Sequence, residues 1–291
     1  MKQMLMIGSF LASFCWVQAQ QADVLKSDAI IQEGKMQYVK AAELYEKANA
    51  AYGLDQRVDT FCLFKAGQNY TRAKQFDKAL PMLEKAYDLN YSEPELYFSL
   101  ADAYGGLKTF EKAEAILMEG KGRFEEMEEG FNKKTAYLFY NSGQYDKAVT
   151  ALELALSQTP QDVTFLYLHA SSLERLNRYP EAIQSFEKVL ALKPNHKNAT
   201  KKLGVIYFKQ TDDLYEKETK RYGSMKNPSR VDYHNSTKKL EEISNDFEKA
   251  IPLLEKSLQD SPKDKAIISC LSVAYRRLKQ TEKADQMKAM L

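Results

Sequence analysis

The sequence is short of turn-forming residues and has no excess of charge of one sign. Twelve glycines and eight prolines in 291 residues are too few for the many tight turns of a β protein. The 42 basic and 40 acidic side chains nearly cancel, so the net charge of +2 gives no electrostatic reason to bind nucleic acid. The 44% content of hydrophobic residues excludes intrinsic disorder. Composition therefore predicts a folded, mainly helical protein.

Long apolar runs are also missing, except near the start of the chain. The run Met4 to Val17 follows Lys2 and precedes the small residue Ala19, which predicts a secretory signal peptide over residues 1–19. This run is shorter than the roughly 20 apolar residues that cross a bilayer, so no transmembrane segment is expected. A lipoprotein signal at Cys15 is disfavoured because Phe14 is bulky where that signal needs a small residue. We expect a chain that is exported, either periplasmic or secreted, and association with the surface of the cell envelope stays open.

A period of about 34 residues organises the rest of the chain. Similar segments place an alanine at Ala79, Ala113, Ala148, Ala182, Ala250 and Ala284. The steps between them are 34, 35, 34, 68 and 34 residues, and a poorer copy at Ala41 lies 38 residues before the first. Apolar residues at i, i+3, i+4 and i+7 on both sides of each alanine indicate two amphipathic helices in every unit.

These units resemble tetratricopeptide repeats. The family pattern of Leu, a small residue and Tyr in the first helix is met by Leu63-Ala66-Gly67-Tyr70, Leu100-Ala101-Tyr104 and Leu203-Gly204-Tyr207. The resemblance covers residues 22–291 and implies an all-α fold, a right-handed α-solenoid of about seven helix pairs. Behind the signal peptide, the solenoid over 20–291 would consist of units at about 22–54, 60–92, 94–127, 129–161, 163–195, 197–263 and 265–291.

The doubled step of 68 residues predicts a helical hairpin extension of the sixth unit. Read as an extra repeat, the added residues would put Glu216 and Lys238 at positions that need small side chains. Read as a hairpin, apolar residues face each other around a turn at Asn227-Pro228, with Phe208 opposite Phe247, Tyr215 opposite Leu240, and Tyr222 opposite Tyr233. We call residues 210–245 the arm, and we expect its first helix to end near Arg221 and its second to begin near Arg230.

The outer half of the arm is basic, with seven basic against three acidic side chains between Glu216 and Lys239. A solvated helical face is the simpler interpretation, and contact with an acidic partner or an anionic membrane surface is the alternative. The candidate contact residues are Lys217, Lys220, Arg221, Arg230 and Lys238.

The resemblance also implies a binding face, because in this family five positions of each first helix face the concave side. At such positions the candidate partner-binding residues are Phe64, Phe98, Tyr137, Tyr140, Tyr167, Arg175 and Phe208. Aromatic side chains bury a large area at small entropic cost, which suits binding of a peptide or a helix. The alternative for any one of them is packing against a neighbouring helix. The family's clamp for a C-terminal carboxylate is not predicted, because Tyr137 replaces the asparagine that would accompany Lys133.

Residues with catalytic or metal-binding potential are scarce and scattered. The two cysteines that follow the signal peptide, Cys62 and Cys270, fall five units apart, so we expect two small buried side chains and no disulfide. None of the three histidines has another four residues away, and His169 occupies an interior-type helix position. We therefore predict no catalytic residue, metal or cofactor.

The preferred hypothesis is a non-enzymatic exported scaffold or adaptor that binds another protein, as a peptide or a helix, in its concave groove. The alternative is a ligand- or glycan-binding module of the cell envelope that uses the same aromatic residues as stacking platforms. A hidden enzyme has only the abundance of carboxylates in its favour.

Overall fold

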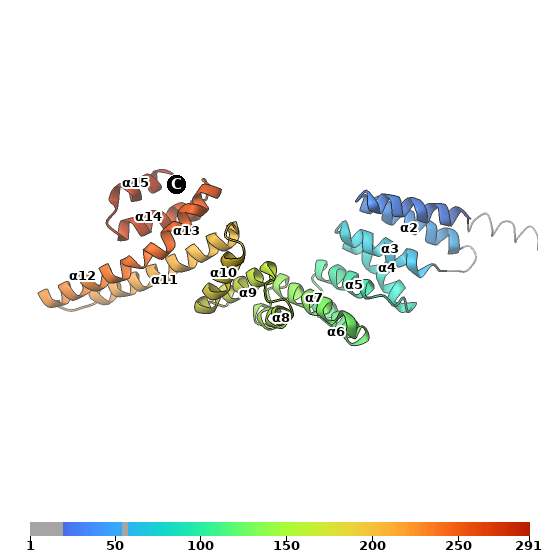
Figure 1. Ribbon diagram of the computed structural model, residues 1–291, viewed down its shortest axis with the longest axis horizontal. Coiled ribbons are helices and arrows are strands. Elements are labelled where there is room, and N and C mark those ends of the chain that lie inside the picture. The colour runs from blue at the N-terminus through green and yellow to red at the C-terminus, as the bar shows by residue number, and fades with distance from the viewer. Residues whose placement is uncertain (1–19, 54–57) are drawn as a thin grey trace, which may run out of the picture. The chain divides into compact units, whose positions relative to one another are not determined.

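The computed structural model describes residues 20–53 and 58–291, and all regular structure in these ranges is helical. The predicted signal peptide and its cleavage position lie outside the described residues. Two compact units divide the chain, one ending at Ala151 and the other beginning at Leu152, and each is described by itself (Figure 1).

The first unit is built from consecutive helices of similar length. After a helical segment over residues 20–34, they are α2 (Tyr38–Gly53), α3 (Thr60–Arg72), α4 (Phe76–Asp88), α5 (Pro94–Gly106), α6 (Phe110–Arg123), a short 3-10 turn η1 (Glu125–Met127) and α7 (Glu128–Asn141). Each of the helices from α2 to α6 packs against the next helix in the chain. The next helix, α8 (Tyr145–Gln158), runs across the division between the units.

The second unit repeats this arrangement with one much longer helix. Its elements are α9 (Val163–Arg175), α10 (Tyr179–Leu192), α11 (Lys197–Gly223), α12 (Arg230–Asn245), α13 (Phe247–Asp260), α14 (Lys265–Arg277) and α15 (Thr281–Ala289). Helix α10 packs on both α9 and α11, and α13 packs on both α11 and α14. The predicted all-α fold of tetratricopeptide-like helix pairs is confirmed.

Small residues set how closely paired helices approach. A Cβ atom added to Gly67 of α3 would lie 2.6 Å from Cγ of Leu83, a fully buried residue of α4. The repeat alanine Ala79 is also fully buried, and its carbonyl oxygen would lie 3.1 Å from the same added atom. The period of small residues in the sequence therefore marks the contact line within each helix pair.

The turn between the two helices of a pair is also periodic. Its left-handed residues are Met36, Lys74, Lys108, Gly143, Asn177 and Lys279, with φ between 58° and 76°. Each lies five residues before a repeat alanine. The N–H of the next residue donates a hydrogen bond to a carbonyl oxygen in the last turn of the first helix. For example, the N–H of Gln75 donates to the Tyr70 carbonyl oxygen at 2.9 Å. In the sixth unit the same place, Asn245, is the last residue of α12, so the arm replaces the turn.

The arm is the predicted helical hairpin, made by α11 and α12. Its first helix ends at Gly223 and its second begins at Arg230, close to the predicted positions. The ring centres of Phe208 and Phe247 are 5.6 Å apart, and those of Tyr222 and Tyr233 are 6.3 Å apart, so both of these predicted pairs face each other. At about 1.5 Å per residue, α11 extends roughly 20 Å beyond a helix of ordinary length in this chain.

One detail of the arm was not predicted. The returning helix is not continuous, because Asp246 separates α12 from α13. The N–H of Asp246 donates to the Ile243 carbonyl oxygen at 3.1 Å, a tighter turn than the α-helical pattern. Because of this break, α12 can form the second helix of the arm. Helix α13 packs on α11 and α14, as the second helix of an ordinary pair does.

The cysteines and the interior histidine have packing roles. Cys62 and Cys270 are free thiols; Cys62 is fully buried, whereas Cys270 is only half-buried, which corrects the prediction for Cys270. Burial raises the pKa of Cys62 to about 12 and that of Cys270 to about 11, so both stay protonated at neutral pH. His169 is 14% exposed, lies 3.0 Å from the Ser185 hydroxyl through Nδ1, and has a pKa lowered by burial.

Candidate binding site

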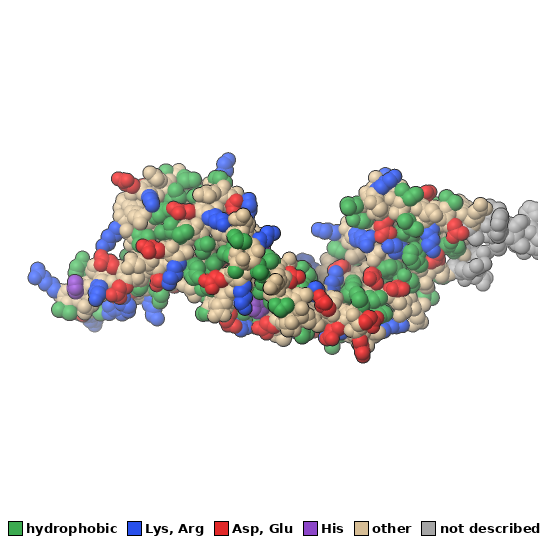
Figure 2. Space-filling model, viewed as in Figure 1, with side chains coloured by type: hydrophobic (Ala, Val, Ile, Leu, Met, Phe, Trp, Pro, Cys, Tyr) green, Lys and Arg blue, Asp and Glu red, His purple; other side chains and the backbone are tan. Residues whose placement is uncertain are grey.

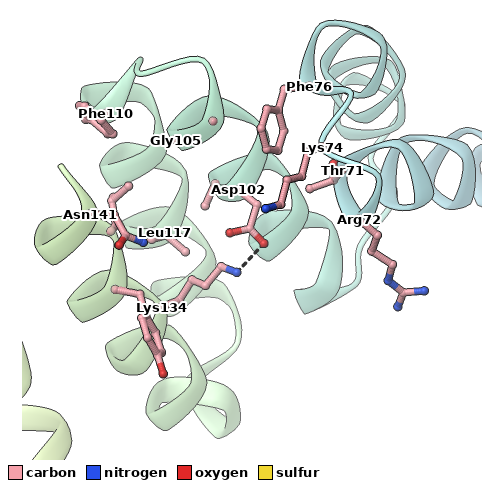
Figure 3. Close-up of a pocket in the computed structure, with 14 residues that line it drawn as sticks. Thr71, Arg72, Lys74, Phe76, Asp102, Gly105, Phe110, Leu117, Lys134 and Asn141 are labelled. Atoms are coloured by element: carbon pink, nitrogen blue, oxygen red, sulfur yellow. Dashed lines mark hydrogen bonds and ion pairs between the residues drawn. The ribbon is translucent and has the colours of Figure 1, made fainter. Parts of the chain in front are cut away.

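A cavity of about 400 Å³ lies in the first unit, where three first helices of successive pairs meet (Figure 3). The ends of α3, α5 and α7 line it, together with the starts of α4 and α6. Its apolar wall is formed by Phe76, Ala101, Phe110, Leu117 and Leu138. Its rim carries Arg72, Lys74, Asp102, Lys134, Tyr137 and Asn141.

Two glycines stand at the end of α5 in the cavity wall, and one of them must be small. A Cβ atom added to Gly106 would lie 2.3 Å from the ring of Phe76, so the start of α4 can lie over this helix end only if the residue is small. A Cβ atom added to Gly105 would lie 3.5 Å from Leu138 of α7, an ordinary contact. The wall is thus set by the packing of three successive helix pairs.

The charged rim has more cations than anions. Lys134 of α7 forms an ion pair with Asp102 of α5 at 2.5 Å. Figure 3 shows Lys74, in the turn after α3, pointing toward Asp102 from the opposite side. Lys74 is exposed, and it makes no ion pair with any residue of the described ranges. Two ammonium groups therefore approach one carboxylate, which leaves a positive charge for an incoming anion.

The third cation of the rim, Arg72, pairs with an acidic residue that does not line the cavity. Arg72 points away from Asp102 in Figure 3 and forms an ion pair with Glu33 at 2.5 Å. Glu33 also pairs with Lys65 at 2.9 Å and accepts a hydrogen bond from the Tyr45 hydroxyl at 3.2 Å. Burial alone would raise the pKa of Glu33, but hydrogen bonds and charge from Lys65 and Arg72 hold it below its usual value. The carboxylate is therefore ionised at neutral pH and fixes Arg72 at the edge of the cavity.

Two of the residues predicted to face a groove belong instead to the core. Phe64 is 5% exposed and stacks on Tyr91 with ring centres 5.0 Å apart. Phe208 is 9% exposed and packs on Phe247 at the base of the arm. These side chains are not available to a partner at the surface of their units, because tight packing between successive helices has covered them.

Other predicted aromatic residues are partly accessible. Tyr137 is 37% exposed and lines the cavity. Phe98 is half-buried against Phe131, with ring centres 4.6 Å apart. Tyr140 is half-buried and meets Tyr145 edge to face at 6.1 Å. Of the candidates in the first unit, Tyr137 is thus the one that the structure places at the cavity.

The remaining candidates lie in the second unit. Tyr167 of α9 contacts Phe186 and His196, with ring centres 5.9 Å and 5.0 Å away. It also lines a cavity of about 380 Å³ with Lys201 and Val205 of α11. The other candidates are exposed: Arg175 on α9, and the arm residues Lys217, Lys220, Arg221, Arg230 and Lys238.

The sequence analysis missed the polar half of the cavity. Asp102 and Asn141 stand at the ninth and thirteenth places of their units, which are among the groove positions used to choose the aromatic candidates. Extending that choice to polar residues would have found both. Lys74 and Lys134 fall outside those positions, and only the fold brings them to the rim.

Metal-binding clusters and membrane-spanning helices are both missing from the described residues. Among residues 20–53 and 58–291, no group of three or more His, Cys, Asp or Glu side chains is placed to hold a metal ion. Within the same ranges, no helix has both the length and the apolar character needed to cross a bilayer.

Comparison with known proteins agrees with the fold. A tetratricopeptide repeat profile matches residues 64–120 and 134–211. The C-terminal part of a TPR repeat-containing protein from Cytophaga hutchinsonii is similar in structure, with a TM-score of 0.66 at 17% identity, over 91% of this chain and 93% of that one.

Two further solved structures are similar over part of the chain. MamA matches with a TM-score of 0.51 at 19% identity, over 60% of this chain and 92% of its own. YrrB, described as a TPR protein with an unusual peptide-binding site, matches with a TM-score of 0.50 at 18% identity, over 60% of this chain and 88% of its own. No curated protein matches the sequence significantly. The profile match covers residues 64–120 and 134–211, and the described helices pack in pairs as in tetratricopeptide repeats.

Proposed function

We propose that the chain is a non-enzymatic scaffold whose first unit binds an extended segment of another protein. The observation that carries this proposal is the cavity of about 400 Å³, which combines an apolar wall with the charged group of Lys74, Asp102 and Lys134. Preformed concave sites with an apolar lining and a few polar groups are typical of ligand binding. The description of YrrB as a peptide-binding tetratricopeptide protein supports the same role for this fold.

The chemistry of the site indicates the kind of segment it would take. An apolar side chain of the partner would cover Phe76 and Phe110, which are both half-buried in the chain alone. An acidic group of the partner would pair with Lys74, because Asp102 can neutralise only one of the two ammonium groups near it. Tyr137 would close one side of the site with its exposed ring. The proposed ligand is therefore a peptide with an acidic residue beside a large apolar one.

The proposal is tested by selecting ligands from a phage-displayed library of random peptides on the purified chain. We expect the selected peptides to share an acidic residue next to a large apolar residue. A peptide from this set should bind at least about tenfold more weakly to the double variant K74E/K134E, because two attractive charges become repulsive. Its binding should weaken as the salt concentration rises.

A matched variant separates this effect from a general change of charge. K47E/K85E reverses two exposed lysines of the same unit that form no ion pair in the described ranges and do not line the cavity. It should bind the peptide like the parent chain. Selection of peptides without acidic residues, or equal loss in both double variants, would refute the proposed site.

We also propose that this binding takes place outside the cytoplasm, in the periplasm or in the medium. The support is in the sequence alone: a charged start, the apolar run Met4 to Val17 and the small residue Ala19. Cell fractionation with mass spectrometry of the N-terminus should find the chain in the exported fraction and starting at Gln20. A cytoplasmic chain that keeps residues 1–19 would refute this placement.

A further inference from the structure

Two of the three acidic side chains in the outer half of the arm are engaged within the hairpin, and the third, Glu216, pairs with Arg277 of α14. Glu218 is 3% exposed and accepts hydrogen bonds from the Ser236 hydroxyl at 2.9 Å and from Arg221 Nε at 2.8 Å. Asp232 accepts a hydrogen bond from the N–H of Ser229 at 2.9 Å, as part of the capping box that starts α12. Both carboxylates therefore stabilise the fold of the arm and offer little negative charge to a partner.

By contrast, most of the basic side chains in the outer half of the arm are not engaged by its acidic residues. Four of them are exposed and make no ion pair with any residue of the described part of the chain: Lys217, Lys220, Lys226 and Arg230. Figure 2 shows Lys and Arg side chains along one edge of the projecting arm. The outer half of the arm therefore presents a cationic surface that its own acidic residues do not neutralise.

Apolar side chains stand at the same end of the arm. Val231 is 66% exposed and Tyr233 is 61% exposed, both in the first turn of α12 beside Arg230. The ring of Tyr233 is held against Tyr222 of α11, so its position is set by the hairpin. An aliphatic residue, an aromatic residue and several cations at one tip match the composition of segments that bind at the membrane interface.

We propose that the tip of the arm docks on an anionic lipid bilayer at the level of the headgroups. Lys220, Lys226 and Arg230 would lie against acidic headgroups. Val231 and Tyr233 would reach the boundary with the acyl chains. The tip would stay at the interface, because residues 224–229 of the turn are not helical and their backbone polar groups need water or headgroups as partners.

The dimensions of the tip favour a bilayer over an acidic protein as the partner. A stable protein interface covers about 800 Å² on each side and takes about 20–30 residues. The tip is the end of a two-helix hairpin, and its large exposed apolar residues are Val231 and Tyr233. Peripheral membrane binding needs only a cluster of basic residues and a small inserted apolar group.

The experiment is co-sedimentation of the purified chain with vesicles of phosphatidylcholine, with and without phosphatidylglycerol. We expect binding only with phosphatidylglycerol, and a decrease as salt rises. The triple variant K220Q/K226Q/R230Q should lose at least about tenfold in binding, because each basic residue near an anionic surface contributes several-fold. V231S should weaken binding to the same vesicles without removing its dependence on phosphatidylglycerol.

A matched variant and a second probe keep the test specific. K188Q/K193Q/K263Q removes three exposed lysines of the second unit that lie outside the arm, and it should bind vesicles like the parent chain. Circular dichroism should show unchanged helix content in every variant. Absence of binding, or equal losses in both triple variants, would overturn the proposal. So would arm-dependent binding to poly-L-glutamate without vesicle binding, which would indicate an acidic protein partner. This inference does not depend on the proposed peptide site.

Discussion

The hydroxyl of Tyr104 on α5 donates a hydrogen bond to Oε1 of Glu84 on α4, at 2.7 Å, and so joins one helix pair to the pair before it. On its other side, the Tyr104 ring lies beneath Nζ of Lys112 on α6, 5.5 Å from the ring centre. A single tyrosine thus contacts the second helix of the preceding pair and that of its own pair. Burial, together with the hydrogen bond to Glu84, raises the pKa of Tyr104 above its usual value.

The same bond recurs along the chain with the period of the repeat. The other pairs are Tyr70 with Glu46, Tyr207 with Glu187 and Tyr275 with Glu255. The separation is 20 residues in three of the four pairs and 24 in the first, where the chain between the pairs is longer. The recurring Glu-Lys segment of the second helix therefore supplies the acceptor for the tyrosine of the following unit.

Removing the hydroxyl should weaken the contact between pairs. We expect Y104F to lower the free energy of unfolding by about 0.5–1.5 kcal/mol, which is the usual net value of one hydrogen bond. Chemical denaturation of Y104F, E84A and the double variant measures the coupling between the two side chains. Additive effects of the two single changes would show that the bond contributes nothing.

The left-handed turn residues give a second prediction. Lys108 has φ of 61°, a conformation that costs a residue with a side chain more than it costs glycine, and Gly143 already occupies the equivalent turn of the next unit. We expect K108G to raise the free energy of unfolding by about 0.5–1 kcal/mol and G143A to lower it by a similar amount. Thermal unfolding followed by circular dichroism tests both. A lower melting temperature for K108G would contradict this account of the turn.

A third prediction separates the core aromatic residues from the surface ones. Phe64 is buried and stacked on Tyr91, so F64A should cost about 3–5 kcal/mol of stability. Tyr137 is 37% exposed at the cavity, so Y137A should change stability much less while weakening binding of a selected peptide. Chemical denaturation of F64A and Y137A measures their loss of stability, and peptide titration measures their loss of binding. Equal stability losses would refute the assignment of Tyr137 to the binding surface.

The buried carboxylate of the arm predicts a dependence on pH. The hydrogen bond from Arg221, opposed by burial and aided by Ser236 and Lys239, lowers the pKa of Glu218 to about 2. This value lies below the ordinary value of about 4.3 that applies in the unfolded chain. The ionised form therefore stabilises the folded chain fully above about pH 5, and the contribution is lost as the pH falls toward 2.

The corresponding experiment compares E218Q with the parent chain between pH 7 and pH 2. At pH 7 we expect E218Q to be less stable by on the order of 1 kcal/mol, a modest value because Arg221 and Lys239 are exposed to solvent. The difference should shrink as the pH falls. E242Q, at an exposed arm residue paired with Lys238 at 3.9 Å, serves as the control and should show little difference at any pH. A difference for E218Q that does not change with pH would be inconsistent with a buried ionised carboxylate.

The sequence alone determined the helix pairs, their period and the arm. This was possible because these features follow from local patterns: apolar spacing along a helix, small residues every 34 positions, and apolar residues placed symmetrically about Asn227-Pro228. The pairs Phe208–Phe247 and Tyr222–Tyr233 confirm that a hairpin with a known turn leaves only one register for its facing residues.

Only the tertiary structure decided which side chains are available for binding. Phe64, Tyr137 and Phe208 were predicted by one rule, yet two are buried and one is exposed, because exposure depends on how closely the next helix pair approaches. Likewise, Lys74 and Lys134 lie 60 residues apart, and both point toward Asp102 only because successive pairs stack. A repeat pattern specifies the contacts within a unit, whereas a binding site depends on distances between units that no local pattern contains.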